Sequence, residues 1–225
     1  MKVELIQTRD GSHSLLVPEM NETYHSTHGA ITESQYVFIK QGLEYYLSQN
    51  PDNEVLNVFE VGFGTGLNAL LTAEFATSKN ITVKYTSLEK NPLAGEVIEA
   101  INYPSLMGGD AQQIFNSLHD ADWGSGIEIN AHFELEKIQT ALQDYSVEGE
   151  KFNVVFFDAF APSKQPEMWA KEMLQKTFDL LLPSGVLVTY CAQGQFKRDL
   201  TSCGFEIEKL PGPPGKAEMT RGLKP

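Results

Sequence analysis

The amino-acid sequence predicts a single α/β domain whose mostly parallel sheet carries helices on both faces, with a β-hairpin at the N-terminus. Strand-like and helix-like segments alternate from residue 55 onward, which is typical of βαβ units. The run FNVVFFDAF (152–160) is apolar almost throughout, as a parallel strand buried on both faces is. The 225 residues suffice for one such domain and are few for two. We therefore expect ligands at the carboxyl ends of the strands.

Residues 1–50 are expected to form a hairpin and a helix that pack on the core of the main α/β region, residues 51–225, so that the chain is a single structural domain overall. The segments KVELIQT and SLLVPEM flank RDGSH, in which Asp10 and Gly11 supply a hairpin turn. Apolar residues then recur at helical spacing over 32–48, which predicts a helix with Thr32 as its N-cap.

Beyond this helix, alternating apolar residues predict strands, and apolar residues three and four apart predict helices. The expected elements are strands at 55–61, 83–89, 127–133, 152–160, 185–191 and 205–210, and helices at 66–78, 92–102, 134–145, 166–181 and 194–203. Residues 103–126 interrupt the alternation with one helix, at 111–118, between glycine-rich ends. This insertion either shapes a pocket beside the sheet or is a plain surface loop. A Pro/Gly-rich tail follows the last strand.

The composition, with 41% hydrophobic and 21% charged residues, is that of an ordinary globular protein. No apolar run approaches the ~18 residues that cross a bilayer, and the N-terminus lacks the apolar stretch of a signal peptide. We therefore expect a cytoplasmic enzyme. The net charge of −13 argues against broad binding of phosphate backbones, although a local basic patch late in the chain would be compatible with it. Cys191 and Cys203 have no CxxC partner, which predicts buried thiols rather than a disulfide or a zinc site.

The stretch VFEVGFGTGLNAL (58–70) places three glycines between a strand and a helix. A loop for nucleoside triphosphates needs GxxxxGK[ST], and this stretch has no such lysine. A dinucleotide loop needs GxGxxG, whereas Gly62, Gly64 and Gly66 form GxGxG. Glu60 precedes the loop, and a carboxylate attracts a cationic ligand but repels a pyrophosphate. The stretch therefore favours S-adenosylmethionine, which carries a sulfonium and an ammonium and has no phosphate.

Acidic residues also end the next two expected strands. Glu89 ends the strand at 83–89, where doubly wound folds place an acid that accepts hydrogen bonds from ribose hydroxyls. The alternative is a surface carboxylate at a strand end. Glu134 follows the strand at 127–133, where it either contacts the adenine amino group or begins the following helix as an acid favoured by the helix dipole.

The stretch VVFFDAFAPSKQPEMW delivers Asp158 from a buried strand and follows it with Phe160 and Trp169. Methyl transfer from a sulfonium requires an amine held close and in line, and the amine must be neutral. Asp158 could position the amine and accept its proton, while the two aromatic side chains exclude water or stack on a base. The alternative interpretation is an aspartate that caps the strand end before a proline-rich turn.

The segment ETYHSTHGAITES is dense in hydrogen-bonding groups. Tyr24, His25, Ser26, His28 and Glu33 fall within ten residues of each other. The two histidines have no further cluster of ligands beside them, so we expect roles in capping or in lining a pocket and no metal site.

In this order and at this spacing, the stretches TYHSTHGAITESQYVFI, FEVGFGTGLNALL and FFDAFAPSKQPEMW resemble the methyltransferase domain of the bacterial tRNA-modification enzyme MnmC. The resemblance covers residues 20–222, roughly. It implies a Rossmann-like fold, S-adenosyl-L-methionine as cofactor, and tRNA as partner. The implied reaction methylates the primary amine of 5-aminomethyl-2-thiouridine at the wobble position to give 5-methylaminomethyl-2-thiouridine.

In that family, a second, FAD-dependent domain removes a carboxymethyl group to produce this amine. The present sequence ends at Pro225 without such a domain. We therefore expect the stand-alone form of the methyltransferase, and a separate enzyme that supplies the aminomethyl group.

Carried over by position, the resemblance assigns particular residues to each role. The cofactor loop falls on Glu60, Gly62, Gly64, Gly66 and Asn68. The ribose-binding acid falls on Glu89, and the segment that lines the pocket falls on Tyr24, Ser26 and Glu33. We expect Tyr24 and Glu33 to serve catalysis with Asp158, and Ser26 to contact the cofactor.

The expected contacts with the substrate come from Phe160 and Trp169 and from the basic residues Lys216 and Arg221. The chain departs from the family in two places. It has Phe133 and Glu134 where the family usually has Gly-Asp, and its stretch GPPGKAEMTRG is less basic than the family's C-terminal run.

Two other functions compete with the tRNA methyltransferase. A methyltransferase for a small-molecule amine is favoured by the acidic net charge. A non-catalytic binding module is disfavoured, because such a module needs neither Asp158 nor the glycine loop. Asp158, Glu33 and a water molecule are all candidates for the proton acceptor.

Overall fold

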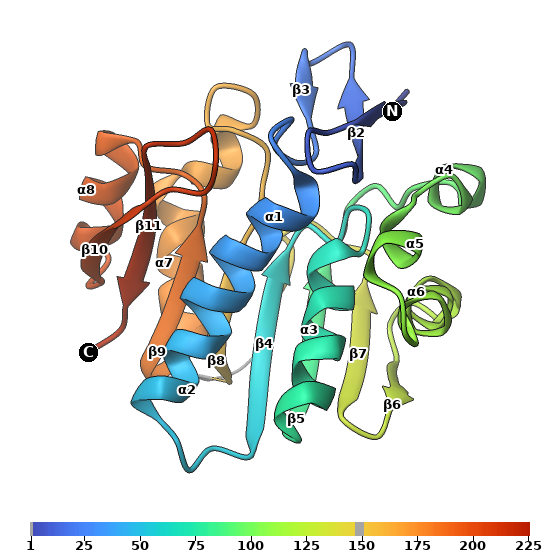
Figure 1. The fold of residues 1–225 in the computed structure, drawn as a ribbon. Helices are drawn as coiled ribbons and strands as arrows, with labels where there is room; N and C mark the ends of the chain where they lie inside the picture. The colour runs from blue at the N-terminus through green and yellow to red at the C-terminus, as the bar shows by residue number, and fades with distance from the viewer. Residues whose placement is uncertain (1, 147–150) are drawn as a thin grey trace.

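The computed structural model describes residues 2–146 and 151–225, and its centre is an eight-stranded sheet in the order β10-β11-β9-β8-β4-β5-β7-β6 (Figure 1). In chain order these strands are β4 (Val55–Val61), β5 (Thr82–Leu88), β6 (Gly126–Asn130), β7 (Phe133–Ile138), β8 (Phe152–Phe157), β9 (Leu181–Thr189), β10 (Glu206–Pro211) and β11 (Glu218–Leu223). The five strands from β9 to β7 pair in parallel, and antiparallel pairs close both edges. The predicted α/β fold class is confirmed.

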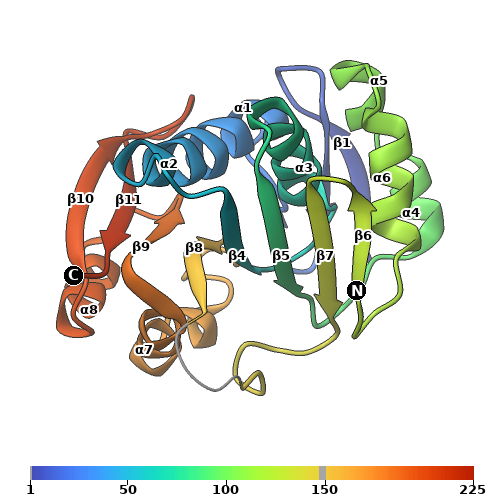
Figure 2. The same ribbon diagram turned by 90° about the horizontal axis from the view of Figure 1, so that it is seen from below.

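Helices cover both faces of this sheet, as Figure 2 shows. Apart from α3 (Leu67–Lys79) and a long N-terminal helix, the helices are α4 (Gly95–Glu99), α5 (Tyr103–Met107), α6 (Ala111–Asp120), η2 (Pro166–Trp169), α7 (Lys171–Leu180) and α8 (Gly194–Ser202). On one face lie α3 (Leu67–Lys79), α6 and a long helix from the N-terminal region, and on the other lie α7 and α8. The predicted helix at 111–118 is therefore present as α6.

The long N-terminal helix runs through α1 (Ala30–Ser34), the π-helical segment η1 (Gln35–Glu44) and α2 (Tyr45–Gln49). It begins two residues before the expected start, and its N-cap is Gly29 rather than Thr32. The Thr32 amide instead donates a 3.0 Å hydrogen bond to Oδ2 of Asp10, so the hairpin turn caps this helix from outside. Gly42 brings the helix against the sheet, because a Cβ there would lie 3.1 Å from Val188.

The predicted N-terminal hairpin is present as β1 (Glu4–Gln7) and β2 (His13–Val17), which pair antiparallel. A short strand, β3 (Glu22–Thr23), adds to β2 and was not predicted. This small sheet lies above the carboxyl ends of the central strands in Figure 1. It therefore brings the polar segment that follows β3 to the ligand-binding edge of the fold.

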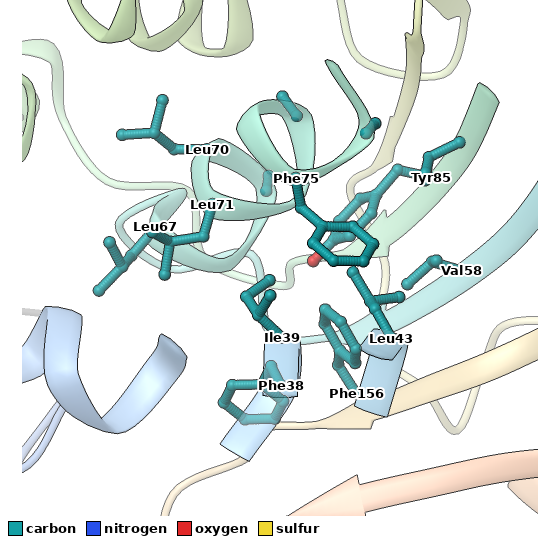
Figure 3. Packing of buried hydrophobic residues seen from close by; sticks show 14 of the residues in the cluster. Phe38, Ile39, Leu43, Val58, Leu67, Leu70, Leu71, Phe75, Tyr85 and Phe156 are labelled. Atoms are coloured by element: carbon teal, nitrogen blue, oxygen red, sulfur yellow. The ribbon is translucent and has the colours of Figure 1, made fainter. Parts of the chain in front are cut away.

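The largest core cluster fills the space between the sheet and the helices of the first face (Figure 3). Phe38 of η1 meets Phe156 of β8 with ring centroids 5.0 Å apart. Leu71 and Phe75 of α3 and Tyr85 of β5 pack in the same cluster and are buried. Burial of each such side chain stabilises the fold by roughly 1.5–3 kcal/mol, so this core fixes α3 and the loop before it against β4.

The structure corrects the expected pattern at 127–145. Residues Phe133–Ile138 form the parallel strand β7 instead of a helix, and Gly126–Asn130 form an antiparallel edge strand. In β7, Phe133, Leu135 and Lys137 are buried while the residues between them are half-buried, which is a period of two. The glutamates and the lysine, which are good helix formers, concealed this period.

The C-terminal tail is also more regular than expected, because Glu218–Leu223 form β11 and insert between β9 and β10. Both Cys191 and Cys203 are free thiols and are buried. In the described part of the chain, no helix has the length and apolar character needed to cross a membrane.

Candidate active site

A cavity of about 640 Å³ opens at the carboxyl ends of the parallel strands, as expected for this fold class. Its walls come from the loops after β4, β5, β7, β8 and β9, from the segment after β3, and from the loop between β10 and β11. The residues predicted from sequence that line it are Tyr24, Ser26, Glu33, Gly62, Gly64, Asn68, Glu89, Asp158, Phe160 and Lys216. Segments far apart in the sequence therefore meet at one site.

The glycine loop takes backbone conformations that favour glycine. Gly62, Gly64 and Gly66 have φ values of 96°, 51° and 75°. Space is short as well, since a Cβ on Gly64 would lie 3.2 Å from the ring of Tyr24. Gly66 lies outside the cavity wall and is the N-cap of α3. At Gly62 and Gly64 the loop thus presents bare backbone to the cavity.

Glu89 follows β5 and faces this loop. Its Oε2 accepts a 3.1 Å hydrogen bond from the Gly64 amide, and its Oε1 accepts a 2.7 Å bond from the Asn91 amide. Each carboxylate oxygen has a further lone pair, so the group can also accept hydrogen bonds from two vicinal hydroxyls. This is the geometry that a ribose-binding acid requires.

Glu60 does not meet the expectation that it faces a cationic ligand. It is fully buried, it is absent from the cavity wall, and its Oε2 accepts a 2.6 Å hydrogen bond from the Ser87 hydroxyl. Burial raises the pKa of the Glu60 carboxyl to about 8, so the group is mostly protonated near neutral pH. Glu60 therefore lies beneath the loop as a neutral side chain.

Asp158 follows β8 directly and faces the cavity. Its Oδ2 accepts a 2.8 Å hydrogen bond from the Asn68 amide group of α3. Burial raises the pKa of Asp158 to about 7, with a further rise from the charge of Glu33, while Asn68 and Lys216 act in the opposite direction. A carboxylate with this pKa can both hold and release a proton near neutral pH.

The polar segment after β3 lines the same cavity as Asp158. The ring of Tyr24 meets the ring of Phe160 edge to face, with centroids 5.1 Å apart. Glu33 accepts a 2.8 Å hydrogen bond from the Ser26 amide and forms an ion pair with Lys216. The predicted cluster is therefore assembled, but Glu33 is already neutralised by a partner.

Trp169 lies away from the cavity, contrary to the expectation that it contacts the substrate. It is buried on the other face of the sheet, and its ring meets those of Phe157 and Phe196. Its indole nitrogen donates a 2.7 Å hydrogen bond to the carbonyl oxygen of Phe160. Trp169 thus anchors the loop that carries Phe160.

Arg221 is also absent from the cavity wall, which corrects its expected contact with the substrate. Its Nε donates a 2.6 Å hydrogen bond to Glu208, and its guanidinium stacks 3.3 Å from the ring centroid of Tyr45. A second bond, 3.1 Å long, reaches the carbonyl oxygen of Gln41. Arg221 therefore ties β10 and β11 to the long helix.

The structure also corrects the expected position of Glu134. It is the second residue of β7, at the end opposite to the cavity, and its nearest cation is Lys84 at 4.0 Å. Since β7 continues to Ile138, the part of the following loop that lines the cavity is residues 140–144. Glu134 was expected to contact the cofactor because the strand was expected to end at residue 133, whereas β7 begins there.

Some residues around the site went unrecognised in the sequence. Thr65 of the glycine loop lies 3.0 Å from Nε2 of His25 and accepts a 3.1 Å hydrogen bond from the Tyr103 hydroxyl. Tyr190 lines the cavity after β9. Its position just past a strand end was the available signal, but a single tyrosine there is also common in plain turns.

Comparison with known proteins agrees with this geometry. A sequence model for S-adenosyl-L-methionine-dependent methyltransferases matches residues 117–225. The protein named tRNA 5-methylaminomethyl-2-thiouridine biosynthesis bifunctional protein MnmC is 30% identical over 92% of this chain in Actinobacillus pleuropneumoniae serotype 5b. The protein of the same name in Leptospira interrogans is 31% identical over 91%. The chain spans about a third of the length of these relatives.

Solved structures resemble the fold. MnmC2 from Aquifex aeolicus has a TM-score of 0.79 at 23% identity, over 98% of this chain and 69% of the other. Spermidine synthase from Thermotoga maritima has a TM-score of 0.53 at 13% identity, over 99% of this chain and 72% of the other. At these identities the likeness concerns the fold alone.

Proposed function

We propose that this chain, an S-adenosyl-L-methionine-dependent methyltransferase similar to the methyltransferase part of MnmC, methylates the primary amine of 5-aminomethyl-2-thiouridine at the tRNA wobble position. The product would be 5-methylaminomethyl-2-thiouridine. The observation that carries the proposal is Asp158, a carboxylate with a pKa of about 7 that faces a cavity walled by a cofactor loop. The names of the relatives support the choice of substrate.

The residues of the cavity fit S-adenosyl-L-methionine. The glycine loop offers backbone and no lysine for phosphates, and Glu89 offers a carboxylate already oriented by two amides. We propose that Glu89 holds the ribose hydroxyls and that residues 140–144, in the loop after β7, contact the adenine. When bound, the cofactor supplies an electrophilic methyl group on a sulfonium.

Methyl transfer forms a bond between the amine nitrogen and the methyl carbon while the bond from carbon to sulfur breaks. The nitrogen must release a proton, because an ammonium has no lone pair with which to attack. We assign the proton to Asp158, whose Oδ2 is held by Asn68 so that the other oxygen is free to accept it. A pKa of about 7 leaves much of Asp158 ionised at neutral pH.

The other groups of the site position the amine. We propose that Tyr24 and Phe160, whose rings meet in the wall of the cavity that Asp158 faces, exclude water from the reacting atoms. Glu33 is the weaker candidate for proton acceptor, because its carboxylate is paired with Lys216. Ser26 contributes its backbone amide to Glu33, so its role is to orient that carboxylate.

The partners follow from the chemistry of this substrate. A primary amine on the uridine must be formed before it is methylated, by a reaction of a different class, and we propose that a separate enzyme supplies it. We also propose a cytoplasmic location, where tRNA is modified in bacteria. Of the two basic residues predicted to contact the substrate, Lys216 and Arg221, Lys216 lines the cavity.

The proposal is tested with tRNA that carries 5-aminomethyl-2-thiouridine, incubated with the protein and labelled cofactor and then digested for mass spectrometry of nucleosides. We expect 5-methylaminomethyl-2-thiouridine to form, and cells that lack the protein to accumulate the aminomethyl nucleoside. Matched tRNA without the aminomethyl group should stay unlabelled. Methylation of free small amines together with no reaction on this tRNA would overturn the proposal in favour of a small-molecule methyltransferase.

A further inference from the structure

Tyr190 was not predicted from the sequence and has no role in the proposed mechanism. It forms a hydrogen bond to the end of the strand that carries the reacting carboxylate. It follows β9 and lines the cavity. Its hydroxyl donates a 2.8 Å hydrogen bond to the carbonyl oxygen of Ala159, the residue after Asp158. Because β8 and β9 are neighbours in the sheet, this bond joins the two strand ends beside the site.

The face of the same tyrosine ring contacts the ammonium group of a lysine side chain. Nζ of Lys216 lies 3.9 Å from the Tyr190 ring centroid and forms the ion pair with Glu33. Glu33 is buried and is fixed in turn by the Ser26 amide. A chain of contacts that we call the Tyr190 bridge thus runs from Glu33 through Lys216 and Tyr190 to Ala159.

The backbone leaves this bridge little freedom. Gly215, next to Lys216, has a φ of 89°, and a Cβ there would lie 2.0 Å from the ring of His28. The loop between β10 and β11 is therefore packed directly on the segment after β3. Since both ends of the bridge are held, the ammonium of Lys216 has a defined place over the tyrosine ring.

We propose that Tyr190 is a positioning residue for methyl transfer, which holds Asp158 through Ala159 and holds Lys216 between Asp158 and Glu33. The inference rests on the proposed function for its reaction, but the bridge itself is a property of the protein alone. If Tyr190 only stabilised the fold locally, its substitution would leave the pH at which Asp158 ionises unchanged.

The charges around Asp158 make the role measurable. Glu33, Lys216, Tyr24 and Tyr190 line the same cavity as Asp158. Asn68 donates a hydrogen bond to it from α3, and the charge of Asp158 also acts on Glu60 and Tyr190. Of these groups, Glu33 raises the pKa of Asp158 and Lys216 lowers it. Displacing the ammonium of Lys216 therefore raises the pH at which Asp158 becomes ionised.

The first test compares Tyr190→Phe, which keeps the ring but loses the hydroxyl, with Tyr190→Leu, which loses both. We expect kcat to fall about fivefold to tenfold in Tyr190→Phe and further in Tyr190→Leu, with the dissociation constant of the cofactor nearly unchanged. Only Tyr190→Leu should also shift the acid limb of the pH profile upward. Tyr36→Phe is the matched control, because Tyr36 donates to the Pro211 carbonyl and faces Lys40 outside the cavity.

The second test uses the opposite effects of Glu33 and Lys216 on the pKa of Asp158. Lys216→Met should move the acid limb of kcat/KM to higher pH, Glu33→Gln should move it to lower pH, and the double variant should lie between them. Shifts of the same sign, or no shift in active variants, would overturn the role in positioning.

The third test needs no substrate. A double-mutant cycle of unfolding free energy with Tyr190→Leu and Lys216→Met, in protein without cofactor, measures the coupling of the bridge. We expect a coupling clearly different from zero, and additive effects would refute the bridge. If the coupling is present but no tRNA is methylated, the proposed function fails and the bridge stands, so the two failures are distinguishable.

Discussion

The ends of β4 and β8 each carry an acidic residue that the sequence places beside the ligand, yet the two carboxyl groups have different surroundings. Glu60 is the penultimate residue of β4, lies under the glycine loop and bonds to Ser87. Asp158 comes one residue after the end of β8 and opens into the cavity. Burial raises the pKa of both, to about 8 for Glu60 and about 7 for Asp158.

An elevated pKa therefore does not by itself identify a reacting group. Glu60 has a higher pKa than Asp158 but no path to a substrate, so its protonation serves the stability of the loop. Asp158 combines a pKa near neutrality with access to the cavity, and both conditions are needed for proton transfer. Substitutions at the two positions should therefore have separable effects.

The largest effect is expected for Asp158→Asn, which keeps the shape of the side chain and removes the proton acceptor. We expect kcat to fall by about 10²–10⁴, while the affinity for the cofactor is retained. In the unsubstituted protein, kcat/KM should decline as pH falls below about 7, because Asp158 then becomes protonated. This limb should vanish in the variant, and Asp179→Asn, on the exposed surface of α7, is the control. Unchanged turnover in Asp158→Asn would contradict its role.

An intermediate effect, on binding and not on chemistry, is expected for Glu89→Ala. The loss of a charged acceptor should weaken cofactor binding about tenfold to a hundredfold, as measured by calorimetry. With saturating cofactor, kcat should stay near that of the unsubstituted protein. Glu89→Gln keeps one oxygen for the Gly64 amide, so its affinity for the cofactor should lie between those of the unsubstituted protein and Glu89→Ala. A normal dissociation constant in Glu89→Ala would remove Glu89 from the ribose site.

The smallest effect is expected for Glu60→Gln, because a mostly protonated carboxyl resembles an amide in shape and charge. Turnover at neutral pH should change by less than about threefold. The pH dependence of stability should change more. The folded-state pKa of about 8 exceeds the ordinary 4.5, so the unfolded chain ionises first and the native state loses stability as pH rises through this window.

Glu60→Gln removes this contribution, and urea unfolding of cofactor-free protein across the same pH range measures it. The slope should become shallower without reaching zero, because Asp158 contributes with the same sign up to about pH 7. An unaltered slope together with lost activity would indicate that Glu60 is ionised and acts on the ligand, which would erase the contrast between the two acids.

Most of the cavity could be predicted from the sequence, because local patterns in the chain determine the loops that form it. The glycine spacing encodes positive φ values that other residues resist, and the apolar run of β8 requires a buried strand that ends beside Asp158. The strand β7 was not predicted, because glutamates, which favour helices, occupy its half-buried positions and a lysine occupies a buried one. There the pairing with β5 decided the structure.

The fold class, the glycine loop and the position of Asp158 can therefore be predicted from local sequence patterns, because periodicity and backbone sterics act over a few neighbouring residues. Only the tertiary structure decided which side chains reach the cavity. Trp169 and Arg221 satisfy partners elsewhere, whereas Tyr190 joins Ala159 to Lys216 across large separations in sequence. The physical reason is that a side chain's direction and its hydrogen-bonding partners are set by packing between distant segments, which no local pattern records.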